Sequence, residues 1–166
     1  MINKINKLSQ GEFIKVFANI FENSSWIASE LYKEKPFDNF ENLSTKMLDI
    51  FDKTTKEKQL KILKAHPDLA DKTKMDSLTL NSKKEQSSAR LDQCSREEFV
   101  EFRNLNDKYK KKFGFPFIYA VKGKTKKEIL SNFRQRVSCD INVEFQEAKK
   151  QVKRIASLRL NEVNKK

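Results

Sequence analysis

Apolar residues recur every three or four positions along most of the chain, the spacing that places one face of an α-helix in a protein core. The first such stripe consists of Phe13, Val16, Phe17, Ile20 and Phe21. It follows Ser9 and Glu12, a pair with the spacing of a capping box, in which each side chain hydrogen-bonds to the backbone of the other residue. The pattern predicts a helix that begins directly after Ser9.

Similar signals mark the later helices. The expected starts are Thr54 with Glu57, Ser82 with Glu85, Ser95 with Glu98, Thr125 with Glu128, and Asp140 alone. The expected ends are Pro36, His66–Pro67 and Gly114, since helical backbone is disfavoured before proline and glycine readily adopts the left-handed conformation that closes a helix. The pattern predicts an all-α bundle of about eight helices. Because no repeat or linker interrupts it, we expect a single domain over residues 1–166.

One segment does not fit a helix. Residues 115–121 read Phe-Pro-Phe-Ile-Tyr-Ala-Val, are apolar on both faces and lie between Gly114 and Gly123. We expect an extended backbone here, although the sequence offers no second strand for it to pair with. Its backbone N–H and C=O groups therefore need other partners. The segment is either a tight hydrophobic connector or a place where a bound polar ligand supplies some of those partners.

Composition limits the class of protein. No apolar run approaches the ~20 residues that cross a membrane, so we expect no membrane partner. The first residues lack the apolar stretch of a secretory signal and the last lack a Ser-Lys-Leu peroxisomal signal, so we expect a cytoplasmic protein. Cys94 and Cys139 are far apart and are expected to be free thiols. Zinc would require both cysteines and His66, the only histidine, to converge, so we expect no metal site.

The net charge of +12 raises the question of a nucleic-acid partner, because basic domains often bind nucleic acid. The lysines are spread over nearly every segment and alternate with glutamates, as they do on solvated helix faces. We therefore expect no nucleic-acid partner. A basic helical binding module stays the alternative to an enzyme, because a basic surface also attracts an anionic substrate.

Two charged or titratable residues break the pattern of a purely structural bundle. His66 stands at a helix end and is followed by Pro67, which fixes the local backbone. Histidine suits proton exchange near neutral pH, but a histidine here can also simply cap its helix. Arg159 continues the apolar stripe of the last helix, whose other members are Phe145, Ala148, Val152 and Ile155. A buried guanidinium there needs a carboxylate from the protein or a substrate, unless this last turn is solvated.

Two polar features remain. Asn106 lies in the apolar seam between Phe102 and Tyr109, where a buried amide must hydrogen-bond to a neighbouring loop or to a ligand. Ser82, Glu85 and Gln86 form a polar cluster, which a capping box would explain and a binding site would also use. The residue types alone do not decide between these readings.

Several strings resemble one enzyme family in their order along the chain. Residues 65–70 read Ala-His-Pro-Asp-Leu-Ala, residues 113–118 read Phe-Gly-Phe-Pro-Phe-Ile, and residues 155–160 read Ile-Ala-Ser-Leu-Arg-Leu. Between and around them stand the Ser82 cluster, Asn106, Tyr109 and Arg136. Together they resemble the 2-oxo-4-hydroxy-4-carboxy-5-ureidoimidazoline (OHCU) decarboxylases, the last enzymes of the route from urate to (S)-allantoin. The resemblance extends from about Leu8 to Leu160.

The resemblance implies an all-α fold, no metal or organic cofactor, a homodimer, and OHCU as the small-molecule substrate. It implies that His66 and Glu85 are the catalytic pair. The substrate contacts that it implies are Pro67, Ser82, Gln86, the backbone at Phe117, Ile118 and Tyr119, and Arg159. In this hypothesis His66 moves a proton at the hydroxyl and carboxylate end of the substrate, and Glu85 holds ring or ureido N–H groups. Arg159 and the extended segment would bind polar oxygen and ring atoms.

One position departs from the family pattern. The family usually has Ala-Gly-Leu where this chain has Ala89, Arg90 and Leu91. An arginine that faces solvent there would be harmless. An arginine that faces the pocket would favour a second alternative, a non-catalytic homologue that binds a purine-derived ligand.

Overall fold

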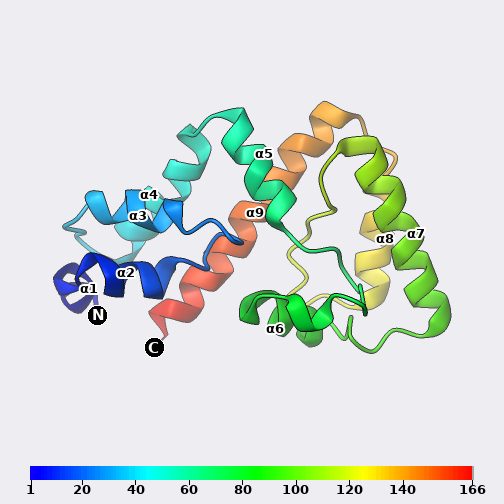
Figure 1. The fold of residues 1–166 in the computed structure, drawn as a ribbon, viewed down its shortest axis with the longest axis horizontal. Coiled ribbons are helices and arrows are strands. Elements are labelled where there is room, and N and C mark those ends of the chain that lie inside the picture. Colours follow the sequence, from blue (N-terminus) through cyan, green and yellow to red (C-terminus); the bar gives the residue numbers. More distant parts are fainter. Residues whose placement is uncertain (166) are drawn as a thin grey trace. The chain divides into compact units, whose positions relative to one another are not determined.

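The computed structural model describes residues 1–165, and Figure 1 shows their path. Within this range the secondary structure is helical and contains no strand. The elements are α1 (Ile2–Lys7), α2 (Gln10–Phe17), α3 (Trp26–Lys33), α4 (Phe40–Lys53), α5 (Lys56–Ala65), the 3-10 helix η1 (Met75–Ser77), α6 (Leu80–Ser88), α7 (Arg96–Phe113), α8 (Lys126–Arg136) and α9 (Ile141–Asn164). The predicted all-α fold is confirmed.

The helices form two compact units. Unit 1 comprises residues 1–65 and the chain from Lys153 onward, and unit 2 comprises residues 66–152. The helix α9 contributes residues to both ranges. The expectation that the whole chain acts as a single domain stays a prediction.

The core of unit 1 is built on the packing of α3 against α2 and α4. Its fully buried side chains include Phe13, Phe17, Leu31, Leu43, Met47 and Phe51. The rings of Phe13 and Phe17 lie 4.6 Å apart, and each large apolar side chain contributes about 1.5–3 kcal/mol of transfer free energy when buried. The apolar stripes of the sequence are therefore the faces that meet in this core.

The core of unit 2 is centred on aromatic rings from α7, α8 and the segment between them. The Phe117 ring stacks on Phe133 of α8 with 3.8 Å between centroids, and Tyr109 of α7 meets both rings edge-on. Residues 116–121 form neither helix nor strand, and most of their side chains are buried. The segment that the sequence set apart is thus the aromatic centre of this unit.

Most of the predicted helix ends are confirmed. Ser9, Ser95 and Thr125 each form a capping box with the glutamate three residues later. The Asp140 carboxylate accepts from the Asn142 N–H at 2.8 Å, and Gly114 closes α7 with a positive φ of 79°. These ends are local features, which explains why the sequence alone locates them.

Two predicted starts were wrong. The α5 helix is capped by Thr55 instead of Thr54: the Thr55 Oγ1 accepts from the Lys58 N–H at 3.3 Å. This register buries Gln59, whose amide donates to the Phe51 carbonyl at the end of α4. The α6 helix begins after Thr79 instead of Ser82, because Thr79 Oγ1 accepts from the Ser82 N–H and Ser82 itself is buried inside the helix.

The described residues include no helix that is both long and apolar enough to span a membrane.

Candidate functional site

His66 lies directly after α5, at the start of unit 2, and its side chain is buried, with 9% of its surface exposed. Pro67 follows and is half-buried. The helix stops at Ala65, as Pro67 predicts, because helical backbone is disfavoured immediately before proline. The only histidine of the chain therefore begins a loop instead of facing solvent from a helix.

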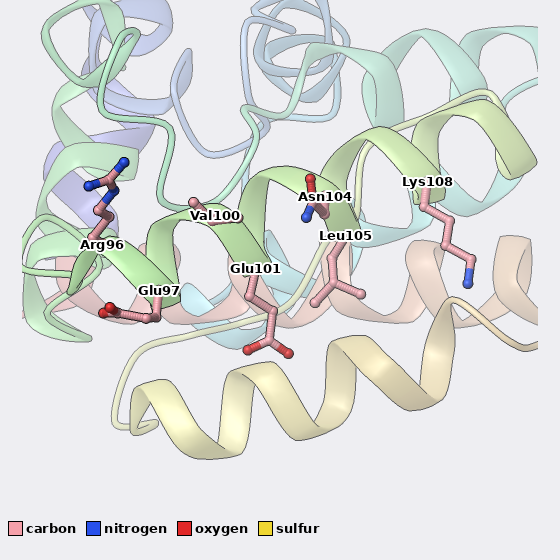
Figure 2. A pocket seen from close by; sticks show the side chains of 7 residues that line it. All are labelled: Arg96, Glu97, Val100, Glu101, Asn104, Leu105 and Lys108. Atoms are coloured by element: carbon pink, nitrogen blue, oxygen red, sulfur yellow. The ribbon is translucent and has the colours of Figure 1, made fainter.

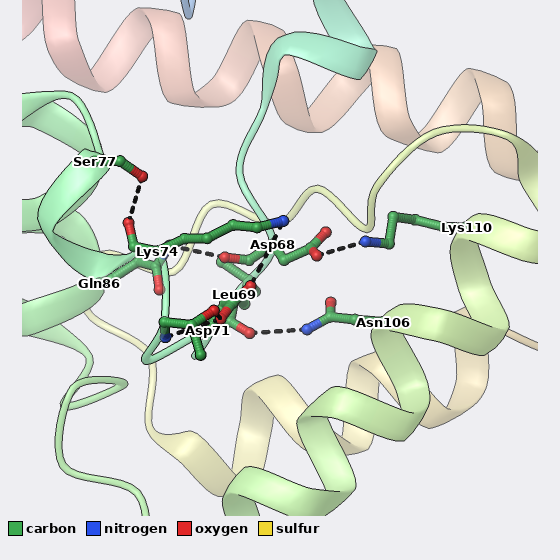
Figure 3. Close-up of polar contacts among 9 residues, drawn as sticks. Asp68, Leu69, Asp71, Lys74, Ser77, Gln86, Asn106 and Lys110 are labelled. Atoms are coloured by element: carbon green, nitrogen blue, oxygen red, sulfur yellow. Dashed lines mark hydrogen bonds and ion pairs between the residues drawn. The ribbon is translucent and has the colours of Figure 1, made fainter.

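That loop is held from α6 by one buried side chain. The Gln86 Oε1 accepts from the Ala70 N–H at 3.0 Å, and the Gln86 Nε2 donates to the Asp68 carbonyl at 3.2 Å. Figure 3 shows Gln86 reaching the loop in this way. Gln86 thus fixes the backbone immediately after the His66–Pro67 pair, and its proposed contact with a substrate stays a prediction.

The α7 helix holds the same loop from another side. The Asn106 Nδ2 donates to the Leu69 carbonyl at 2.9 Å, and Lys110 forms an ion pair with Asp68 at 2.6 Å (Figure 3). Of the two partners that the sequence left open for Asn106, the neighbouring loop is confirmed for its N–H₂ group. Residues 66–71 are therefore braced by α6 and α7, which limits the directions in which His66 can point.

Asp71 closes this loop. Burial raises its pKa, but hydrogen bonds from the Thr73 hydroxyl and N–H, together with Lys74 and Lys110, outweigh that effect and leave the pKa below its usual value. The carboxylate therefore stays ionised at neutral pH and keeps its hydrogen bonds to Thr73.

Ser82, Glu85 and Gln86 lie three and four residues apart on α6 and therefore share one face of that helix. Ser82 and Gln86 are buried, whereas Glu85 is half-buried at the edge of the face. Gln86 contacts the loop that follows His66. The helix α6, which also carries Glu85, is therefore packed against that loop. The structure thus brings the proposed catalytic pair onto neighbouring elements of unit 2.

The extended segment receives side-chain partners in place of a strand. The Arg136 Nη1 donates to the Ile118 carbonyl at 2.6 Å, and the Gln151 Oε1 accepts from the Ala120 N–H at 3.1 Å. Sequence reasoning did not identify either role. A usable signal existed for Arg136, which continues the buried α8 stripe of Ile129 and Phe133.

Arg159 belongs to unit 1, whereas the other candidate residues belong to unit 2. Its Nη1 lies 2.8 Å from Glu22 Oε2 and 3.0 Å from the Asn19 carbonyl oxygen, and its side chain is 5% exposed. The sequence left open whether Arg159 is solvated or paired with a carboxylate. The solvated arginine is wrong, and the Glu22 carboxylate is its partner within the protein. A contact between Arg159 and a substrate stays a prediction.

Arg90 is exposed and ends α6 in the left-handed conformation, with φ of 57°. The Leu91 N–H donates to the Gln86 carbonyl and the Arg90 N–H to the Ser87 carbonyl, the two hydrogen bonds of a Schellman motif. Glycine is the usual residue at this position, because it has no Cβ to strain the backbone. The family's glycine at this position thus matches a helix end.

We expect Arg90→Gly to raise the free energy of unfolding by about 0.5–1 kcal/mol, because relief of left-handed strain exceeds the added chain entropy of glycine. Urea denaturation would measure this shift. Arg90→Ala is the matched control, since it removes the charge but keeps the Cβ, and its midpoint should stay near that of the parent. Equal urea midpoints for all three proteins would contradict the view that the Cβ of Arg90 strains the left-handed backbone.

A shallow hollow of about 540 Å³ follows one side of α7, and none of the predicted site residues lines it. Its lining residues are Arg96, Glu97, Val100, Glu101, Asn104, Leu105 and Lys108. Figure 2 shows them along the helix, with Glu101 directed toward α8, where it pairs with Arg134. Val100 is 47% exposed, so this face offers apolar surface between charged ends.

Both cysteines are free thiols, as expected, and burial raises the pKa of the Cys94 thiol. In the described part of the chain, no group of three or more His, Cys, Asp or Glu side chains is arranged to hold a metal ion.

Comparisons with known proteins find similarity over nearly the whole of this chain. A family model described as OHCU decarboxylase matches residues 6–161. The 2-oxo-4-hydroxy-4-carboxy-5-ureidoimidazoline decarboxylase of Haloferax volcanii is 37% identical over 97% of this chain and 94% of its own length. A uric acid degradation bifunctional protein of Bacillus sp. (strain TB-90) is 36% identical over 98% of this chain, which spans only 32% of that protein. The crystal structure of (S)-allantoin synthase has a TM-score of 0.79 at 28% identity, over 98% of this chain and 54% of that one.

Proposed function

The chain belongs to the OHCU decarboxylase family, and we propose that it is a carboxy-lyase that converts OHCU to (S)-allantoin and CO2 in urate degradation, without a cofactor. The observation that carries the proposal is the match of residues 6–161 to this family, together with 37% identity to a decarboxylase of nearly the same length. The second activity of the longer bifunctional relatives is not part of the proposal.

The chemistry fits the residue types. The substrate carboxylate is on a carbon next to a ring C=N bond, so the electron pair left when the C–C bond to CO2 breaks can spread into that bond. The neighbouring ureido-bearing carbon then takes up a proton, and the hydroxyl on the decarboxylated carbon loses its proton to become a ring C=O, which gives allantoin without any other electron acceptor. The protein has to bind the ring, hold the carboxylate and direct one proton to one face.

His66 and Glu85 are the proposed catalytic pair. His66 would exchange a proton at the hydroxyl and carboxylate end of the substrate, from a loop that Gln86 and Asn106 hold in place. Glu85 would accept hydrogen bonds from ring or ureido N–H groups. Pro67, Ser82 and Gln86 are proposed to line the substrate, and the backbone at residues 117–119 to contact its polar edge. For Arg159, the Glu22 ion pair would hold the guanidinium in one orientation toward substrate oxygen.

The direct test is the formation of chiral allantoin. Purified protein would be added to OHCU made freshly from urate by urate oxidase and the upstream hydrolase, and circular dichroism would follow the product. We expect rapid appearance of the (S)-allantoin signal above the slow racemic background. A folded protein that does not accelerate the conversion of OHCU would overturn the proposal. It would favour the two alternatives, a non-catalytic homologue or a basic binding module.

We further propose a homodimer that uses the hollow on α7. Apart from Arg96, the residues that line the hollow are matched in pairs about a midpoint between Phe102 and Arg103, as a two-fold axis across antiparallel helices requires. Glu97 would then face Lys108 of the partner subunit. Val100 would face Leu105 of the partner subunit, which joins apolar surface at the centre to opposite charges at the ends.

Charge exchange tests this interface. Glu97→Lys would place like charges together at both ends of the contact, and we expect the dimer Kd to rise by about tenfold. Adding Lys108→Glu to the same protein should restore association. Sedimentation velocity would measure both, with the exposed Val143→Glu as a control outside the hollow. A dimer unaffected by either charge change would exclude this face.

A cytoplasmic location is also proposed, since two free thiols suit a reducing compartment.

A further inference from the structure

Unit 2 contains a buried charge network that the proposed chemistry does not use. Glu144 of α9 accepts a hydrogen bond from the Tyr109 hydroxyl at 2.5 Å and from the Arg136 Nε at 2.7 Å. The side chains of Arg136 and Glu144 are only 6% and 1% exposed. Burial, with the hydrogen bond to Glu144, raises the pKa of Tyr109, so its hydroxyl stays protonated and donates. Three helices thus contribute to one fixed network.

The network ends on the backbone of the extended segment. The Arg136 guanidinium uses its Nε for Glu144 and its Nη1 for the Ile118 carbonyl at 2.6 Å, and it lies 4.5 Å from the Phe117 ring centroid. Lysine has neither the planar fork nor the stacking surface to make these contacts together. Arg136 therefore holds one particular peptide group, between residues 118 and 119, in one orientation.

Peptide geometry extends this orientation to the next N–H. In a trans peptide the C=O of one residue and the N–H of the next point in opposite directions. Since the Ile118 carbonyl is directed at Arg136, the Tyr119 N–H is directed away from it. The Ala120 N–H, on the Ile118 side of an extended chain, meets Gln151, in agreement with this alternation.

The backbone N–H groups of Phe117 and Tyr119 lack protein partners among the described residues. In the described part of the chain, the backbone N–H groups of Phe117 and Tyr119 make no hydrogen bond, whereas the inward Ile118 carbonyl and Ala120 N–H are both paired. Phe117 is 1% exposed, and a backbone donor without a partner is unusual inside a folded protein. The arrangement leaves the Tyr119 N–H available on the side opposite the Ile118 carbonyl and Arg136.

We propose that Arg136, fixed by Glu144 and Tyr109, is a positioning residue that directs the Tyr119 N–H at a carbonyl oxygen on the substrate ring. The inference rests on the proposed decarboxylase function and adds to it a residue that does not touch substrate. A ring held by a rigid donor presents one face to the incoming proton, so Arg136 contributes to the (S) configuration of the product. A merely structural ion pair would have no effect on that configuration.

The test compares Arg136→Lys with Arg134→Lys, a matched change on the same helix in the exposed pair with Glu101. We expect Arg136→Lys to lower kcat about 100-fold, with little change in KM and a clear loss of enantiomeric excess. Allantoin would be analysed at enzyme concentrations high enough that the catalysed reaction is much faster than the spontaneous decay of OHCU. Arg134→Lys should match the parent in all three quantities. A folded Arg136→Lys protein with parental kcat and enantiomeric excess would overturn the inference.

A second measurement uses the unmodified protein and does not depend on the folding of a variant. In ¹⁵N-labelled protein, adding (S)-allantoin should shift the amide resonances of Phe117 and Tyr119 more than those of Ile118 and Ala120. The opposite pattern would overturn the inference. Failure of the unmodified protein to turn over OHCU would instead remove the proposed function, and the inference with it.

Discussion

Replacing His66 by alanine is expected to lower kcat for OHCU by about 100- to 10,000-fold, the range for loss of a positioned proton-transfer group. Gln86 and Asn106 hold the loop after His66 through backbone atoms of Asp68, Leu69 and Ala70, so the loop should keep its conformation without the imidazole. The rate of (S)-allantoin formation measures the loss, and far-ultraviolet circular dichroism establishes that the variant is folded.

Lys64→Ala is the matched control, because Lys64 is exposed on the last turn of α5, two residues before His66. It should retain the parental rate. A folded His66→Ala protein with more than a tenth of the parental kcat would exclude His66 as the proton-transfer group. The histidine would then be a helix-capping residue, the other reading that the sequence allowed.

Replacing Arg159 by alanine is expected to lower the free energy of unfolding by about 3–5 kcal/mol, because it leaves the Glu22 carboxylate buried without its cation. The Asn19 carbonyl would also lose a hydrogen bond. Chemical denaturation would measure the change. A loss below about 1 kcal/mol would show that the pair behaves like an exposed one.

Because Arg159→Ala should lose stability, its activity alone cannot identify a substrate contact. The double variant Glu22→Leu/Arg159→Met removes both charges and should recover most of the lost stability. If that protein is stable but has a raised KM for OHCU, Arg159 binds the substrate. If it is stable and fully active, Arg159 serves only the fold.

The sequence located features that are decided locally. Ser9, Ser95, Thr125 and Gly114 cap their helices as predicted, because each cap joins residues only three or four positions apart. The start of α6 was missed for the opposite reason. Thr79 prevails over Ser82 because burial of Ser82 and Gln86 against other parts of unit 2 sets the helix register, and Leu80 is left 68% exposed.

The same distinction between local and long-range features applies to the candidate site. The positions of His66 and Arg159 in their helical patterns were enough to single them out. The role of Arg136 was not accessible, since it depends on a carbonyl group 18 residues away and on Glu144 and Tyr109 from two other helices. Periodicity shows that a charged residue faces the core, but it does not show which backbone group that residue meets.

The residue ranges that make up the two units affect how the chain folds during synthesis. Unit 2 is one continuous stretch, residues 66–152, so all of its contacts can form before Arg159 is synthesised. Unit 1 needs two segments that are far apart in the sequence: the Arg159 side chain bonds to the Asn19 carbonyl across 140 residues. The helices of unit 1 that precede residue 66 must therefore wait until Arg159 has been synthesised before the Glu22 carboxylate gains this cation. We expect this waiting segment to be the part of a nascent chain that chaperones and proteases reach first.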